Sequence, residues 1–177
     1  MCIRDRLTAE GLVEATAQRG FRVTSATEDD LRDIALVRSQ IEKLALMLSI
    51  EHGNVEWEGR VIAAHHKLQK AEQAVASAAD DLVALQWDEA CRVFSATLID
   101  ACDSPRLIDL HRKFFDQSRR YRLAQLREGQ LNFLQRKKRH QELLEAALSR
   151  NTEQALMILQ QEIDAELRSE ALSLIHI

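Results

Sequence analysis

Apolar residues recur every three or four positions along most of the chain, which is the spacing of amphipathic helices. The clearest stripe follows Thr27 and Asp30, which together resemble a capping box at a helix N-terminus. The stripe consists of Leu31, Ile34, Ile41, Ala45 and Leu48. His52-Gly53-Asn54 ends this first helix, which we expect to bury one face against a core.

Five further helices follow from the same periodicity and from capping residues. We expect them at about 55–75, 80–101, 105–129 and 131–149, and from the cap Asn151 onward. The sharpest boundary is Ser104-Pro105, because Ser is a favoured N-cap and Pro a favoured first helical residue. Short links between such helices predict an all-α fold, an antiparallel bundle of six or seven helices.

The N-terminal segment has a different pattern. Residues 7–10 look like the end of a helix closed by Gly11. Two β-tolerant runs, at 12–13 and 21–23, flank Gln18-Arg19-Gly20, so we predict a hairpin with Gly20 at its tip in a positive-φ conformation. A β-hairpin therefore precedes the bundle.

This pattern divides the chain into residues 1–25, a helical domain at 26–172 and a tail at 173–177. The terminal sequences MCIRDR and LSLIHI fit neither flanking helix. We hypothesise that they derive from a truncated gene call or assembly and not from the natural protein.

Composition supports helices, since the 177 residues include only five Gly, one Pro and 5% aromatics. The net charge of -4 argues against nucleic-acid binding by the chain as it stands. Three cysteines without a CxxC pair favour a reducing cytoplasm. The longest apolar stretch, around 44–50, is too short to span a membrane.

Several motifs, taken in order, resemble the GntR family of transcription factors, specifically the FadR subfamily with its FCD effector domain. LTAEGLV and QRGFRV come first, and RSQIEKLA follows with the R-x-x-x-E-x-x-A pattern at Arg38, Glu42 and Ala45. Later segments at 93–107 and 140–156 are also similar, and NVEWEGRVIAAHHKL resembles the CsiR-type branch.

The resemblance implies that residues 1–25 are a remnant of a winged helix-turn-helix, with Arg19 and Gly20 at the DNA-contacting wing tip and most of the recognition helix missing. Without that helix the chain cannot read bases. The acidic charge then describes a sensor domain separated from its basic DNA-binding half. The alternative is that Arg19 is an ordinary charged turn residue.

Many FCD domains bind a divalent metal, and the resemblance maps the ligand positions onto Cys91, Ser95, His140 and Glu162, of which only His140 matches. Cys91, His140 and Glu162 could still ligate zinc and leave one position open. We favour the alternative, that the replacements abolish metal binding, so that no cofactor is expected. A buried Glu162 would then need a cation such as an arginine.

Effector-binding candidates are Arg38, Arg119, Arg122 and His140. Arg38 interrupts the apolar stripe of the first helix, so it could clamp a carboxylate from inside the bundle. An internal ion pair with Glu42 is the alternative. Arg119 and Arg122 belong to a basic patch around Tyr121 that could equally be solvated, and we expect the basic run at 136–140 to lie on a solvated face.

The sequence thus predicts the ligand-sensing and dimerisation part of a GntR/FadR-type regulator. Its expected partners are a small carboxylic acid, a second copy of the chain and, for the full-length protein only, operator DNA. No enzyme is expected, because a di-iron helical bundle needs Glu-x-x-His motifs and no His has a Glu three residues before it. A stand-alone helical ligand-binding or interaction bundle without DNA binding is the alternative.

Overall fold

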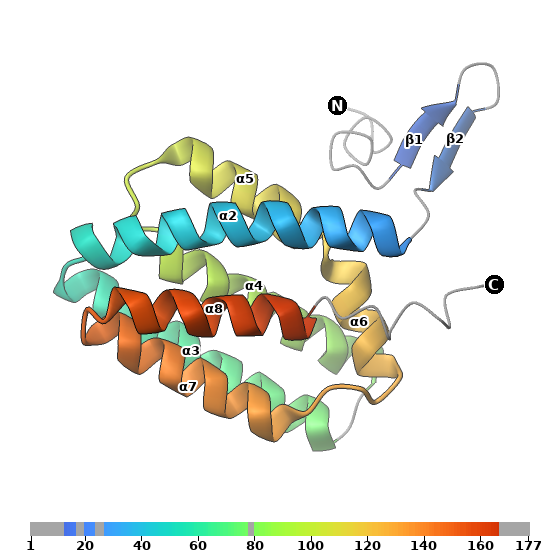
Figure 1. The fold of residues 1–177 in the computed structure, drawn as a ribbon. Helices are drawn as coiled ribbons and strands as arrows, with labels where there is room; N and C mark the ends of the chain where they lie inside the picture. The colour runs from blue at the N-terminus through green and yellow to red at the C-terminus, as the bar shows by residue number, and fades with distance from the viewer. Residues whose placement is uncertain (1–12, 17–19, 24–26, 78–79, 167–177) are drawn as a thin grey trace.

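A computed structural model describes residues 13–16, 20–23, 27–77 and 80–166, and this part of the chain forms seven helices and one hairpin (Figure 1). Strands β1 (Val13–Thr16) and β2 (Gly20–Val23) pair antiparallel where a hairpin was predicted. Gly20 pairs with Thr16 as the first residue of β2, directly after residues 17–19, which the structure does not describe. Arg19, the predicted helix end at 7–10 and the tail at 173–177 lie outside the described residues.

The predicted helix boundaries agree with the structure at most of their caps. The helices are α2 (Glu28–His52), α3 (Val55–Ser77), α4 (Asp81–Ile99), α5 (Pro105–Gln117), α6 (Arg119–Arg127), α7 (Phe133–Leu148) and α8 (Thr152–Glu166). Side chains of Thr27, Asp80, Ser104 and Asn151 each accept a hydrogen bond from the backbone N–H three residues later. The all-α bundle is confirmed.

One predicted helix is in fact two, because the chain bends at Ser118 between α5 and α6. Ser118 stays in the right-handed helical region, but its ψ angle of -7° is shifted from the ideal helical value, and its hydroxyl donates a hydrogen bond to the carbonyl of Phe115 at 2.8 Å. The bend turns α6 away from the direction of α5 (Figure 1). Between Pro105 and Gly129 the sequence contains no Gly or Pro, so propensity alone does not reveal the break.

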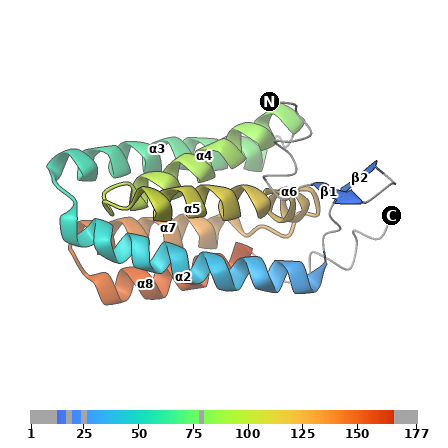
Figure 2. The same ribbon diagram turned by 90° about the horizontal axis from the view of Figure 1, so that it is seen from above.

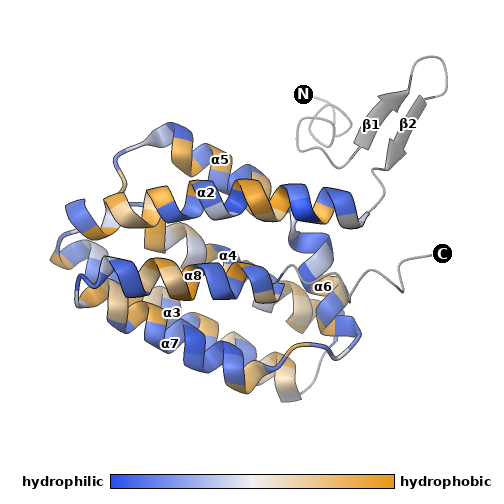
Figure 3. Cartoon of the chain, viewed as in Figure 1, coloured by the Kyte–Doolittle hydropathy of each residue, from blue (hydrophilic) through white to orange (hydrophobic). Residues whose placement is uncertain are grey.

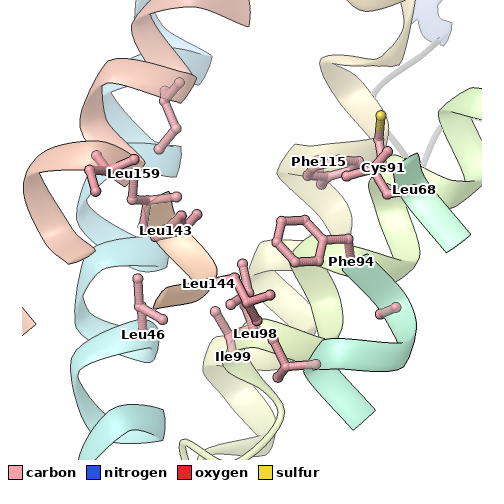
Figure 4. Packing of buried hydrophobic residues seen from close by; sticks show 14 of the residues in the cluster. Leu46, Leu68, Cys91, Phe94, Leu98, Ile99, Phe115, Leu143, Leu144 and Leu159 are labelled. Carbon is pink, nitrogen blue, oxygen red and sulfur yellow. The ribbon is translucent and has the colours of Figure 1, made fainter. Parts of the chain in front are cut away.

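The long helices pack in neighbouring pairs around one core. Helix α2 lies beside α5 and α8, while α3 packs against α4 and α7 (Figures 1 and 2). Each helix carries both apolar and polar residues (Figure 3). In the core, Phe94 lies near Leu68, Cys91 and Phe115 (Figure 4). Among the described residues, no helix has the length and apolar character needed to cross a bilayer.

The buried face of α2 differs from the predicted stripe. Arg38, Glu42 and Ser49 are almost completely buried, whereas Ile41 and Leu48 are only half-buried. Leu31, Ile34 and Ala45 of the predicted stripe are buried as expected. The buried face also includes the two charged residues, because internal ion pairs allow them to enter the core.

Two glycines provide a matched test of packing at the α2–α3 turn. A Cβ at Gly53 would lie 2.3 Å from Cε3 of the buried Trp57 and 2.6 Å from the carbonyl of Ser49, whereas one at Gly59 in α3 would meet nothing within 4 Å. We expect Gly53→Ala to lower the free energy of unfolding by about 1–3 kcal/mol. Gly59→Ala should raise it by about 0.5–1 kcal/mol, because Ala favours a helix. Urea denaturation measures both, and equal effects would contradict the packing argument.

Candidate functional site

Ten ionisable side chains from seven helices meet in the interior of the bundle, and we call them the buried charge network. Each is less than 10% exposed. The members are Arg38, Glu42, Glu72, Asp88, His111, Arg122, Arg136, His140, Glu162 and Glu166. Burial of an unpaired charge is costly, so the pairing of these groups decides whether the fold is stable.

Arg38 points into the interior from α2. Its Nε donates to Glu42 Oε1 at 2.6 Å, and its Nη1 donates to Glu166 Oε2 at 2.8 Å and to Ser118 Oγ at 3.0 Å. The internal ion pair with Glu42, one of the two predicted alternatives, is therefore present. Burial alone would raise the pKa of the Glu42 carboxyl, but Arg38 and His111 lower it to about 2.

Arg136 of α7 is the main residue that the sequence prediction missed. Its Nη1 lies 2.9 Å from Glu162 Oε1, and its Nη2 lies 3.6 Å from Glu166 Oε1 and 3.9 Å from Cys91 Sγ. The prediction of a solvated face at 136–140 was wrong for Arg136 and His140 and right for the two lysines between them. Arg136 and His140 continue the buried positions Leu143, Leu144 and Ala147 at helical spacing, a signal that could have found them.

His140 lies between two carboxylates. Its Nε2 is 3.2 Å from Glu162 Oε1, and its Nδ1 is 3.2 Å from Glu72 Oε1. Burial opposes protonation, but these carboxylates raise the pKa of His140 above its usual value. Glu162 also accepts a hydrogen bond from Arg139 Nε at 2.6 Å. Two arginines, Arg136 and Arg139, thus pair with Glu162, for which one arginine partner was predicted.

The candidate metal ligands are brought together but do not fit a metal ion. Cys91, Ser95, His140 and Glu162 all line one cavity. The Arg136 guanidinium contacts both the thiol and the Glu162 carboxylate. Burial raises the pKa of the Cys91 thiol to about 12. Within the described ranges, no three His, Cys, Asp or Glu residues are arranged to hold a metal.

Arg122 and Arg119 occupy different environments. Arg122 is buried, donates to Asp88 Oδ1 through Nε at 3.0 Å and Nη2 at 2.8 Å, and lies 3.9 Å over the Phe115 ring. Arg119 is half-exposed and reaches the second oxygen of Asp88 at 2.9 Å. Of these two, Arg122 enters the core, but neither lines the cavity. Asp88, the carboxylate they share, was not predicted.

Two openings adjoin the network. The inner cavity, lined by Arg38, Cys91, His140 and Glu166 among others, has about 30 Å³ of open volume, enough for water but not for an organic acid. The outer pocket, of about 130 Å³, lies where α6, α7 and α8 meet. Its polar lining comprises Gln125, Gln130, Asn132, Gln135, Arg136 and Arg139. Arg136 lines both openings.

Residues 33–165 match the FCD domain family, which is most of the chain. The chain belongs to the FCD-domain regulators of the GntR family. The HTH-type transcriptional repressor GlaR of Escherichia coli K12 is 34% identical over 161 residues, covering 89% of this chain and 72% of the repressor. The HTH-type transcriptional regulator BphR of Paraburkholderia xenovorans LB400 is 34% identical over 164 residues, covering 91% of this chain and 65% of BphR.

Solved structures support the same FCD fold at low sequence identity. E. coli McbR/YncC superposes with a TM-score of 0.74 at 19% identity, covering 95% of this chain and 80% of that protein. A putative GntR regulator from Rhodococcus sp. RHA1 superposes with a TM-score of 0.73 at 20% identity, covering 98% of this chain and 78% of that protein. The chain spans about two thirds to three quarters of the length of GlaR and BphR.

Glu42 allows a test of the network by pH. Its folded-state pKa of about 2 lies below the ordinary 4.5, so its contribution to stability is present above pH 4.5 and is lost as the pH falls towards 2. We expect Glu42→Gln to lower the free energy of unfolding at pH 7 by about 3 kcal/mol, because it leaves buried positive charge under-compensated. The difference from wild type should shrink between pH 5 and 2.

Urea denaturation followed by circular dichroism measures this difference. Glu51→Gln, an exposed change on the same helix, is the control and should alter stability by less than about 0.5 kcal/mol. A Glu42→Gln effect that stays constant down to pH 2 would contradict the assignment.

Proposed function

We propose that this chain is the ligand-sensing and dimerisation part of a GntR/FadR-type transcriptional regulator, and that a small organic acid bound in its bundle modulates DNA binding by the full-length protein. The observation that carries this proposal is the convergence of three buried arginines, from α2, α6 and α7, on carboxylates of other helices. Buried ion pairs often add little stability compared with apolar residues of similar size. Their presence therefore favours a role in recognition.

The proposed ligand carboxylate is held by guanidinium groups and not by a metal. Arg38, Arg136 and His140 line the inner cavity and are assigned to effector binding. Arg122 and Arg119 have a positioning role and do not contact the ligand. Both form ion pairs with Asp88, and Arg122 also donates to Ser118 Oγ at 2.7 Å. Arg–carboxylate contacts in a site of low dielectric are strong enough to select an acid over a neutral analogue.

The position of Arg38 suggests how ligand binding would affect the DNA-binding half of the protein. It lies in α2, the helix that directly follows the hairpin segment in the chain. A ligand that binds one arrangement of α2 better than another shifts the population between them, and with it the placement of the DNA-binding half. We further propose that the working unit is a homodimer, with Arg19 and Gly20 at the DNA in the full-length protein. The role is regulatory and non-catalytic.

A thermal-shift screen of small mono- and dicarboxylates tests ligand sensing. At a hundredfold excess over Kd, a ligand stabilises the folded chain by about 2.7 kcal/mol, which is several degrees in Tm. We expect at least one acid to do so equally with and without EDTA. Loss of the shift in EDTA would contradict guanidinium-based binding.

Variants of Arg38 locate the site. Arg38→Gln should abolish the shift because it removes the cation, and Arg38→Lys should weaken it because the bidentate fork is lost while the charge remains. Arg32→Gln, an exposed change on the same helix, should leave the shift intact.

The regulatory part of the proposal requires the full-length protein. Its binding to its own promoter region, measured by fluorescence anisotropy, should change when an acid from the screen is added. Failure of the full-length protein to bind that DNA would favour the stand-alone ligand-binding bundle instead.

A further inference from the structure

The Glu166 carboxylate lies between two arginines from different helices. Its Oε2 accepts a hydrogen bond from Arg38 Nη1 at 2.8 Å, and its Oε1 lies 3.6 Å from Arg136 Nη2. The side chain is 4% exposed and lines the inner cavity. Burial opposes ionisation, but Arg38, Arg122 and Arg136 hold the pKa of Glu166 below its usual value. A carboxylate between two guanidinium groups has the arrangement expected of a bound organic acid.

Removal of Glu166 would leave each of its two arginines with another carboxylate. Arg38 would keep Glu42 at 2.6 Å, and Arg136 would keep Glu162 at 2.9 Å. Each arginine therefore retains a close anionic partner without Glu166. Displacement of this carboxylate by another carboxylate conserves charge and leaves no buried guanidinium without a counter-ion.

The outer pocket provides an approach to this position. Ala165, next to Glu166 in α8, lines the outer pocket, and Arg136 lines both openings. Gln125 Nε2 donates to the backbone carbonyl of Glu166 at 2.8 Å, so an amide of the pocket also holds the end of α8. The last described turn of α8 thus stands between a polar pocket of about 130 Å³ and the paired arginines.

We propose that Glu166 is a built-in competitor of the effector: the ligand carboxylate takes its place between Arg38 and Arg136, and the remainder of the ligand lies in the outer pocket. This inference rests on the proposed function. The amide side chains and Arg139 in that pocket select a small acid that carries a second polar or anionic group. Ligand binding releases the Glu166 side chain from both arginines, while the Gln125 hydrogen bond to its backbone remains. Ligand occupancy is thereby coupled to the contacts that hold the end of α8.

Acetate replaces the missing carboxylate in the first test. In Glu166→Ala we expect a lower Tm that acetate restores in a saturable manner, against sodium chloride at equal ionic strength. Wild type and Asp164→Ala, which removes an exposed carboxylate from the same helix, should respond at least tenfold more weakly. Glu166→Gln, which keeps the shape but not the charge, is the second variant if Glu166→Ala does not fold.

Calorimetric titration with acids that stabilise wild type is the decisive measurement. Both Glu166 variants should bind them at least tenfold more tightly than wild type and Asp164→Ala. If wild type binds such an acid and the Glu166 variants bind it no more tightly, the competitor role is overturned while the proposed function stands. If no carboxylate stabilises wild type or either variant, the proposed function fails, and this inference fails with it.

Discussion

The burial of three guanidinium groups within one helical bundle is the constraint on which the arrangement of this molecule depends. Arg38, Arg122 and Arg136 reach the core from three helices, and each requires a carboxylate from elsewhere in the chain. Asp88 of α4 meets Arg122, and α8 supplies Glu162 and Glu166. Apolar packing holds the helices together, but these pairs fix which faces of the helices meet, because any other register would leave buried charge unpaired.

Local signals in the sequence were sufficient for most of the fold. Thr27, Asp80 and Ser104 cap the helices as expected, since a side chain that satisfies the first free N–H groups acts within three residues. The positions of Cys91, His140 and Glu162 around one cavity also agree with the family pattern. Both results depend on short-range geometry or on motifs that resemble those of known proteins.

The sequence did not reveal which charged residues pair across large distances along the chain. Glu166 is 128 residues from Arg38. Its helical spacing from Glu162 and Ile163 places it on the buried face of α8, but this spacing does not identify its partner. Arg136 stands beside two lysines that are solvated, so its burial appears only when its spacing from His140 and the apolar positions after it is considered. The bend at Ser118 was missed for a related reason: its partners include Arg38, which lies in another helix.

The Ser118 hydroxyl uses its whole hydrogen-bonding capacity. A hydroxyl has one proton and two lone pairs, and here the proton goes to the Phe115 carbonyl while Arg38 and Arg122 each take a lone pair. The two arginines therefore share a single oxygen atom although they are compensated by different carboxylates. A movement of one guanidinium would change the hydrogen bond that the shared hydroxyl offers to the other, so this oxygen links the Arg38–Glu166 pair to the Arg122–Asp88 pair.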